Sequence, residues 1–291
     1  MDDVPYEFVD RIFTKLSSED ISIIDVKIPI WQEVKRVYEE KLECLDVSLN
    51  LATTFNEFSY EIYRDTDPLK RQIPFDEALQ MDFRFIRVSA FRISQPNPND
   101  NWSKLAANRI PDLLDYISLF KLRFLVLHGQ SGSPTDLLRR IANFKTATLN
   151  IDCVLIGEEF VKRQLRNAEL ECLYVYNFDR YAELKNDLEA FVCRPNFHTL
   201  HCKFECFDME NFKRIVAYWK TTQPTPRRSV MKWIIWMRTS RNFQGGFASW
   251  MTPTGTAYAP QFKEYIGNFM LTVECDNRYS KLRFDYVDCI E

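Results

Sequence analysis

A six-residue apolar pattern recurs along most of the chain and constrains its fold more than any other feature. Each copy has apolar residues at its first, fourth and sixth positions, and the copies begin at Leu42, Phe83, Leu122, Phe144, Leu170, Phe197, Val230 and Tyr279. From the third copy to the seventh, the central apolar residues lie at positions 125, 147, 173, 200 and 233, in steps of 22, 26, 27 and 33 residues. Short apolar runs with this alternation indicate strands, so we expect one strand at each copy.

The segments between these strands have the apolar spacing of helices. They cover residues 136–141, 159–165, 184–191 and 207–219. Alternation of strand and helix predicts an α/β fold with a parallel sheet and right-handed crossovers. Steps of about 20 to 29 residues are typical of leucine-rich repeats, so we expect residues 42–291 to form a leucine-rich-repeat-like solenoid. A non-repetitive α/β fold is the alternative, because the first two steps are about forty residues long and most copies lack the usual Asn or Cys turn.

The first forty residues have a different pattern, which predicts three short helices. Apolar residues at positions 8, 9, 12, 13 and 16 form one helical stripe after Pro5, and a proline at a helix start costs no hydrogen bond. Ser17 or Ser18 can cap a second helix, and Trp31 belongs to a third. Three helices this short bury little surface alone.

This stretch resembles an F-box over residues 3–41, and its opening is similar to the starts of nematode F-box families. The matching positions are Val4, Pro5, Phe8, Ile12, Leu16, Asp20, Ile21, Trp31 and Val34, whereas residues 27–30 depart from the family pattern. The resemblance implies that residues 1–41 are an adaptor-binding F-box and residues 42–291 a substrate-binding domain. The chain would then be the substrate-recognition subunit of a Skp-cullin-F-box ubiquitin ligase, which recruits a protein target for ubiquitination and degradation.

The resemblance also implies which residues bind these partners. Val4, Pro5, Phe8, Ile12, Leu16 and Trp31 would contact a Skp-type adaptor and, through it, a cullin. In leucine-rich architecture, the residues flanking the inward apolar pair face the concave side. The expected substrate-binding residues are therefore Phe124, Val126, His128, Tyr174, Tyr176, His201, Lys203, Lys232, Ile234 and Trp236, with Cys172 and Thr199 beside them. Trp250, in a glycine-containing aromatic loop, is a further candidate.

Composition and charge exclude several other classes of partner. Hydrophobic residues make up 46% of the chain and charged residues 27%, which is enough apolar material for a folded core. The formal net charge of −3 does not suit nucleic acid or an anionic membrane. No apolar run approaches the roughly 20 residues that cross a bilayer, and the acidic start is unlike a signal peptide. We therefore expect a protein of the cytoplasm or nucleus with reduced cysteines.

Motifs of catalysis and metal binding are missing from the sequence. The eight cysteines include no C-x-x-C pair, and no phosphate loop, nucleophile elbow or metalloprotease motif is present. His198 and His201 lie three apart in a strand, which gives poor zinc geometry with Cys202 and Cys206. We expect no enzyme activity, metal or cofactor. The alternative to a ligase receptor is a scaffold that binds a protein partner, with the N-terminal helices capping its end.

Overall fold

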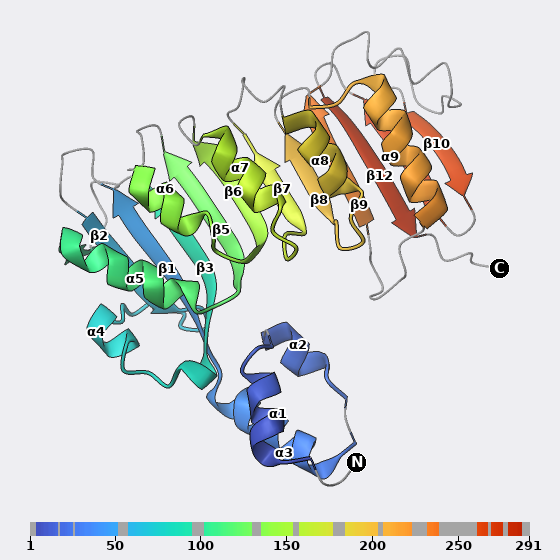
Figure 1. Ribbon diagram of the computed structural model, residues 1–291. Coiled ribbons are helices and arrows are strands. Elements are labelled where there is room, and N and C mark those ends of the chain that lie inside the picture. Colours follow the sequence, from blue (N-terminus) through green and yellow to red (C-terminus); the bar gives the residue numbers. More distant parts are fainter. Residues whose placement is uncertain are drawn as a thin grey trace. The chain divides into compact units, whose positions relative to one another are not determined.

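The computed structural model describes residues 4–16, 18–25, 27–51, 58–94, 102–129, 135–153, 157–176, 184–202, 206–222, 232–238, 261–266, 269–275 and 279–286. The fold is α/β, with helices and a large, mostly parallel sheet (Figure 1). The chain divides into two compact units. Unit 1 comprises residues 1–126 and 144–146, and unit 2 comprises residues 127–143 and 147–291.

Unit 1 begins with the three expected helices, which share a small core of their own. They are α1 (Tyr6–Phe13), α2 (Ser18–Ile23) and α3 (Pro29–Lys41). Pro29 starts α3, where its fixed φ suits the first turn. The cluster consists of Val9, Phe13, Ile21, Val34 and Tyr38, each at most 1% exposed. All three helices contribute to this cluster, and Leu42 and Phe85 pack against it from outside the helices.

The first strand of unit 1 follows α3 directly, and its strands lie side by side in the order β5-β3-β1-β2-β4, with residues 127–129 of β5 belonging to unit 2. They are β1 (Glu43–Leu51), β2 (Phe58–Arg64), β3 (Ile86–Ser94), β4 (Ser103–Leu105) and β5 (Leu122–Gly129). Between them lie α4 (Phe75–Ala78), the 3₁₀ turns η1 (Phe83–Phe85) and η2 (Ala107–Arg109), and α5 (Ile110–Ser118). β1 is parallel to β3 and antiparallel to β2, and β2 pairs antiparallel with β4.

The central strand β1 buries polar side chains on one face, and these are satisfied within the sheet. Asp46 is 6% exposed and accepts hydrogen bonds from Ser89 Oγ at 2.6 Å and Arg92 Nη1 at 2.9 Å. The register between β1 and β3 shifts at Leu45/Asp46. A buried carboxylate is tolerated only with such partners, which fixes the pairing of these two strands.

Unit 2 repeats a strand-helix alternation and ends in an antiparallel ribbon. Its elements are α6 (Thr135–Ile141), β6 (Thr146–Cys153), α7 (Glu158–Leu165), β7 (Cys172–Val175), α8 (Lys185–Val192), β8 (Thr199–Cys202), α9 (Met209–Thr222), β9 (Lys232–Arg238), β10 (Gln261–Ile266), β11 (Phe269–Cys275) and β12 (Tyr279–Tyr286). β6, β7, β8 and β9 pair in parallel, whereas β9-β12-β11-β10 pair antiparallel. Helices α7, α8 and α9 lie over the same face of the strands (Figure 1).

The apolar pattern identified the strands correctly but not all of their directions. All eight copies overlap described strands, and the four expected helices of the body are α6 to α9. The copy at Tyr279 was expected to be parallel, but β12 is antiparallel to β9. Only three residues separate β11 from β12, which is too short for a parallel crossover. None of the eight copies lies in the strands β2, β4, β10 and β11, although Met270, Val273 and Cys275 of β11 fit the same spacing.

Candidate protein-binding surfaces

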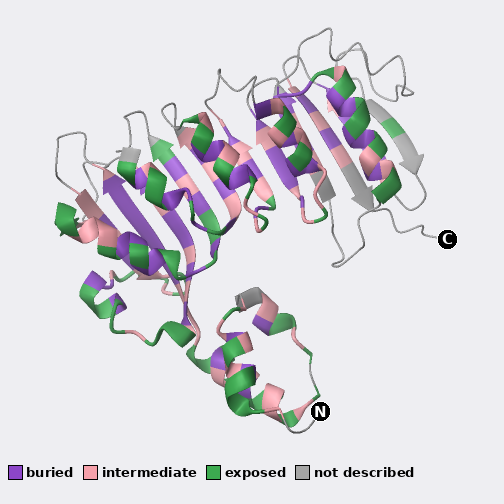
Figure 2. Ribbon diagram, viewed as in Figure 1, coloured by how far each residue is buried: buried purple, intermediate pink, exposed green. Residues whose placement is uncertain are grey.

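The apolar stripe of α1 divides into an inner line and an outer line. Val9 and Phe13, one turn apart, are fully buried in the helical cluster. Phe8 and Ile12 follow a second line, on which Phe8 is 54% exposed and Ile12 is half-buried. Val4, which precedes the helix, is half-buried and packs against the helical cluster. Figure 2 shows both exposed and buried residues on α1. An exposed phenylalanine thus lies on a helix that is anchored by its other side.

The other predicted adaptor-binding residues are placed differently from one another. Pro5 is exposed, whereas Leu16 and Trp31 are half-buried and pack against the helical cluster. The Trp31 ring lies edge-on to Phe13, with centroids 6.1 Å apart. Tyr6 and Ile23, which the sequence did not nominate, are 38% and 61% exposed. Their exposure could not be read from the stripe, because they fall outside it.

A second candidate surface lies in unit 2, on the face of the sheet opposite α7, α8 and α9. Tyr174, His201 and Trp236 are partners in register across β7, β8 and β9, so their side chains project from one face. Their neighbours along the strands, such as Leu173, Leu200 and Ile235, are fully buried. Along these strands, half-buried residues on this face therefore alternate with fully buried residues on the other face.

Five rings on this face form a continuous cluster, which we call the aromatic cluster: Tyr174, Tyr176, His201, Trp236 and Tyr279. His201 lies 5.1 Å from Tyr176 and 3.8 Å from Trp236, measured between ring centroids. Trp236 stacks on Tyr279 at 4.3 Å with an interplanar angle of 11°. All five are half-buried, so each retains exposed ring surface. Burial raises the pKa of both Tyr174 and Tyr176, which keeps their hydroxyls neutral.

Tyr279 and two cations beside the cluster were not nominated from the sequence. Lys281 is the register partner of Trp236, and Arg283 is the partner of Ile234, a nominated residue that is half-buried. The eighth copy of the apolar pattern offered the signal, because Leu282 is its inward residue and Lys281 and Arg283 flank it. On this face of β7, β8, β9 and β12, the described side chains include no carboxylate, although Asp152 on β6 and Glu274 on β11 flank it.

The remaining nominated substrate-binding residues do not join the cluster in the described structure. Phe124 is 36% exposed and Val126 half-buried, and both belong to unit 1. His128 is exposed, with its Nδ1 atom 3.8 Å from a carboxylate oxygen of Asp152. Lys232 has its backbone in β9, but its side chain lies outside the described part of the structure. Lys203 and Trp250 lie entirely outside the described residues.

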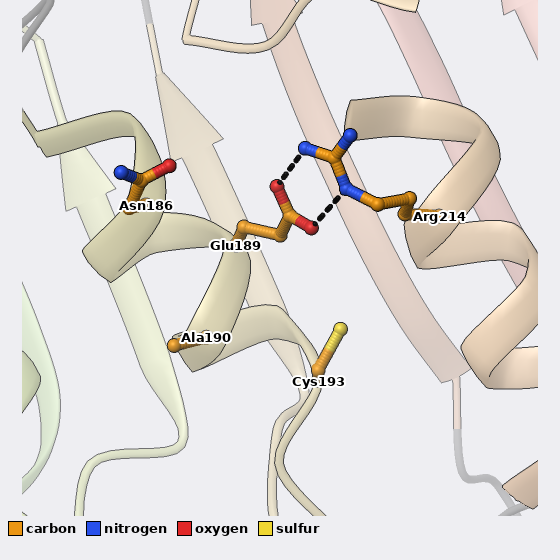
Figure 3. Close-up of a pocket in the computed structure, with 5 residues that line it drawn as sticks. All are labelled: Asn186, Glu189, Ala190, Cys193 and Arg214. Atoms are coloured by element: carbon orange, nitrogen blue, oxygen red, sulfur yellow. Dashed lines mark hydrogen bonds and ion pairs between the residues drawn. The ribbon is translucent and has the colours of Figure 1, made fainter. Parts of the chain in front are cut away.

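A shallow pocket of about 340 Å³ lies between α8 and α9, on the helical face of unit 2 (Figure 3). It is lined by Asn186, Glu189, Ala190, Cys193 and Arg214. Arg214 donates two hydrogen bonds of 2.8 Å to Glu189 and thereby lowers the pKa of that carboxyl. Burial raises the pKa of the Cys193 thiol to about 11. A neutral thiol beside a paired carboxylate provides no nucleophile or base at neutral pH.

The Cys172 thiol and the His198 ring form another close pair, at 3.7 Å between Sγ and Nδ1. Burial raises the pKa of Cys172 and lowers that of His198, so both groups are neutral and the thiol is not activated. Among the described residues, no three His, Cys, Asp or Glu side chains are arranged to hold a metal ion. No helix in the described ranges is long and apolar enough to cross a membrane.

Comparison with known proteins gives no relative: no family model matches the chain, and neither the curated proteins nor the solved structures contain a match.

Proposed function

We propose that this chain is the substrate-recognition subunit of a Skp-cullin-F-box ubiquitin ligase. The N-terminal helices α1 to α3 act as the F-box and bind a Skp-type adaptor, which links the chain to a cullin. The observation that carries this proposal is the outer line of α1, where Phe8 is 54% exposed beside the half-buried Ile12 while Val9 and Phe13 hold the helix from within. Exposed apolar side chains on an anchored helix are available to a protein partner.

The substrate is proposed to bind the aromatic cluster. Tyrosine and tryptophan are enriched at protein interfaces, because they bury much apolar surface while keeping a polar group. Lys281 and Arg283 stand beside the rings, with Glu274 on β11 as the register partner of Lys281. A protein segment that buries apolar surface against the rings therefore suits this face best. The chain performs no bond chemistry in this role, since ubiquitin transfer follows from holding the target near the charged enzyme.

A scaffold without ubiquitin coupling is the second candidate. It is favoured by Phe85, which packs against the helical cluster, and by Arg87 of β3, which donates to the carbonyls of Phe13 and Leu16, as they would if these helices merely covered the end of the sheet. The two functions differ in one respect that can be measured: only the receptor binds the adaptor through the outer line of α1.

The test is the affinity for a recombinant Skp-type adaptor, measured by calorimetry for the wild type and two variants. Phe8→Ala removes the exposed ring, and we expect about tenfold to hundredfold weaker binding, because burying such a ring contributes about 1.5–3 kcal/mol. Leu119→Ala is the matched control, since Leu119 is 71% exposed at the end of α5 and does not belong to helices α1 to α3. Wild-type chain that does not bind, or Phe8→Ala that binds equally well, contradicts the receptor proposal.

A further inference from the structure

One side chain, Arg87 of β3, attaches helices α1 to α3, which we call the helical block, to the strands by hydrogen bonds. Its Nε donates to the carbonyl of Leu16 and its Nη2 to the carbonyl of Phe13, both at 2.7 Å. Its Nη1 donates to the carbonyls of Ile86 at 2.7 Å and Arg84 at 3.0 Å. A single guanidinium therefore joins the end of α1 to the start of β3.

The acceptors explain why an arginine stands at this position. The last carbonyls of a helix have no partner within the helix, and the helix dipole places partial negative charge there. Phe13 is the last residue of α1, and Leu16 lies in the turn that follows. A planar guanidinium presents its donors in a fixed fork, so it binds both carbonyls in one orientation, which a flexible ammonium does not. Arg87 is half-buried, which makes the direction of this fork a structural constraint.

The residues before Arg87 strengthen the same junction. Phe85 packs against the helical cluster, and its ring centroid is 5.0 Å from that of Tyr38. Tyr38 in turn donates to Asp10 of α1, at 3.1 Å to the carboxylate. The helical block is also joined covalently to the sheet, since α3 leads into β1 through Leu42 alone. Two attachments, through β1 and through β3, prevent the block from turning about either one.

We propose that Arg87 is a positioning residue that fixes the direction in which α1 to α3 present the outer line of α1 relative to the strands of unit 1. The role within the chain follows from the contacts of Arg87. Its consequence for ubiquitin transfer rests on the proposed function: a fixed direction restricts which lysines come near the charged enzyme, whereas a loose one widens that set.

The experiment measures the distance between two spin labels attached through unnatural amino acids at Glu33 on α3 and Ser118 on α5, both exposed and both in unit 1. Wild type and the control Arg64→Met, which removes a half-exposed ion pair with Glu43, should give the same narrow distribution. Arg87→Met keeps the aliphatic stem but loses every donor, and we expect a distribution about twofold wider. A distribution as narrow as that of the wild type overturns the proposal.

A purely structural role predicts a different result, so folding of α1 is followed by hydrogen exchange at Val9 and Phe13. If Arg87→Met unfolds α1, the test is repeated with Arg87→Lys, because lysine retains the positive charge near the carbonyls without the forked donors. A wider distribution of label distances with α1 still protected from exchange supports the positioning role, and a distribution as narrow as that of the wild type contradicts it.

In the assembled ligase, the adaptor affinity of the positioning variant should equal that of the wild type while more of the chain's own lysines become ubiquitinated. An unchanged set of lysines rejects the functional consequence. Failure of the wild type to bind the adaptor rejects the proposed function alone, because the label distances do not depend on it.

Discussion

At the scale of single residues, burial decides the chemistry of Cys193 in the pocket between α8 and α9. Desolvation, with Glu189 nearby, raises the pKa of this thiol to about 11. At pH 8 its thiolate fraction should be about one hundredth of that of an unshifted thiol, because each pKa unit is a factor of ten. Alkylation by iodoacetamide, followed by mass spectrometry of the Cys193 peptide, should be slower in the folded chain by a similar factor.

The pH profile separates this electrostatic cause from simple obstruction. A raised pKa predicts that the alkylation rate climbs about tenfold per pH unit from 8 to 10 and levels off only near 11. Obstruction of an unshifted thiol predicts a plateau above pH 9. The chain unfolded in urea is the control, and equal rates in folded and unfolded chain would disprove the shift.

The face of the sheet on which a residue lies was predictable wherever the strand register could be inferred. Tyr174, His201 and Trp236 were placed on one face from the sequence because side chains alternate strictly along a strand and parallel neighbours keep that alternation. Tyr279 was missed because its strand pairs antiparallel with β9 and is separated from it along the chain by β10 and β11, so the repeat does not give its neighbour. Arg87 was also missed, since nothing local in the sequence of β3 indicates that its partners lie more than 70 positions earlier.

At the scale of elements, α9 shows how a single side chain secures a helix on the sheet. Trp219 is fully buried, stacks on Phe197 and donates its indole N–H to the Val192 carbonyl at 2.9 Å. Trp219→Ala should lower the free energy of unfolding by about 3–5 kcal/mol, because it leaves a large cavity. Trp219→Phe should cost less, about 1–3 kcal/mol, mainly from the carbonyl that loses its donor. Urea unfolding followed by circular dichroism measures both.

Tyr218→Phe on the same helix is the control, since Tyr218 is half-buried and the change removes only a hydroxyl. Its midpoint should stay close to that of the wild type. A loss below 1 kcal/mol for Trp219→Ala would contradict the role of Trp219, given the usual cost of emptying such a site. The helix itself was predictable from its apolar period, whereas the antiparallel strands β2, β4, β10 and β11 were not, because antiparallel pairing does not require the six-residue pattern of the parallel strands.

At the scale of the whole molecule, the open question is whether residues 1–41 are a module or part of the body. Their formal charge is −4, from ten acidic and six basic residues, which leaves +1 for the remaining 250. The cluster formed by Val9, Phe13 and their neighbours belongs to the helices alone, which favours a module. Phe85 and Arg87, however, connect it to β3, so removing the helices uncovers part of the body.

Deleting residues 1–41 separates these two descriptions. If the helices are a module, residues 42–291 should still unfold cooperatively, with faster hydrogen exchange confined to the start of β3, where the bonds from Arg87 are lost. The uncovered Phe85 ring should promote self-association, and Phe85→Ser in the truncated chain should reverse it, as measured by light scattering. If the truncated chain loses its far-ultraviolet circular dichroism instead, the helices are a necessary cap. That outcome favours the scaffold over the receptor, because an adaptor-binding module should be separable from the domain that holds the substrate.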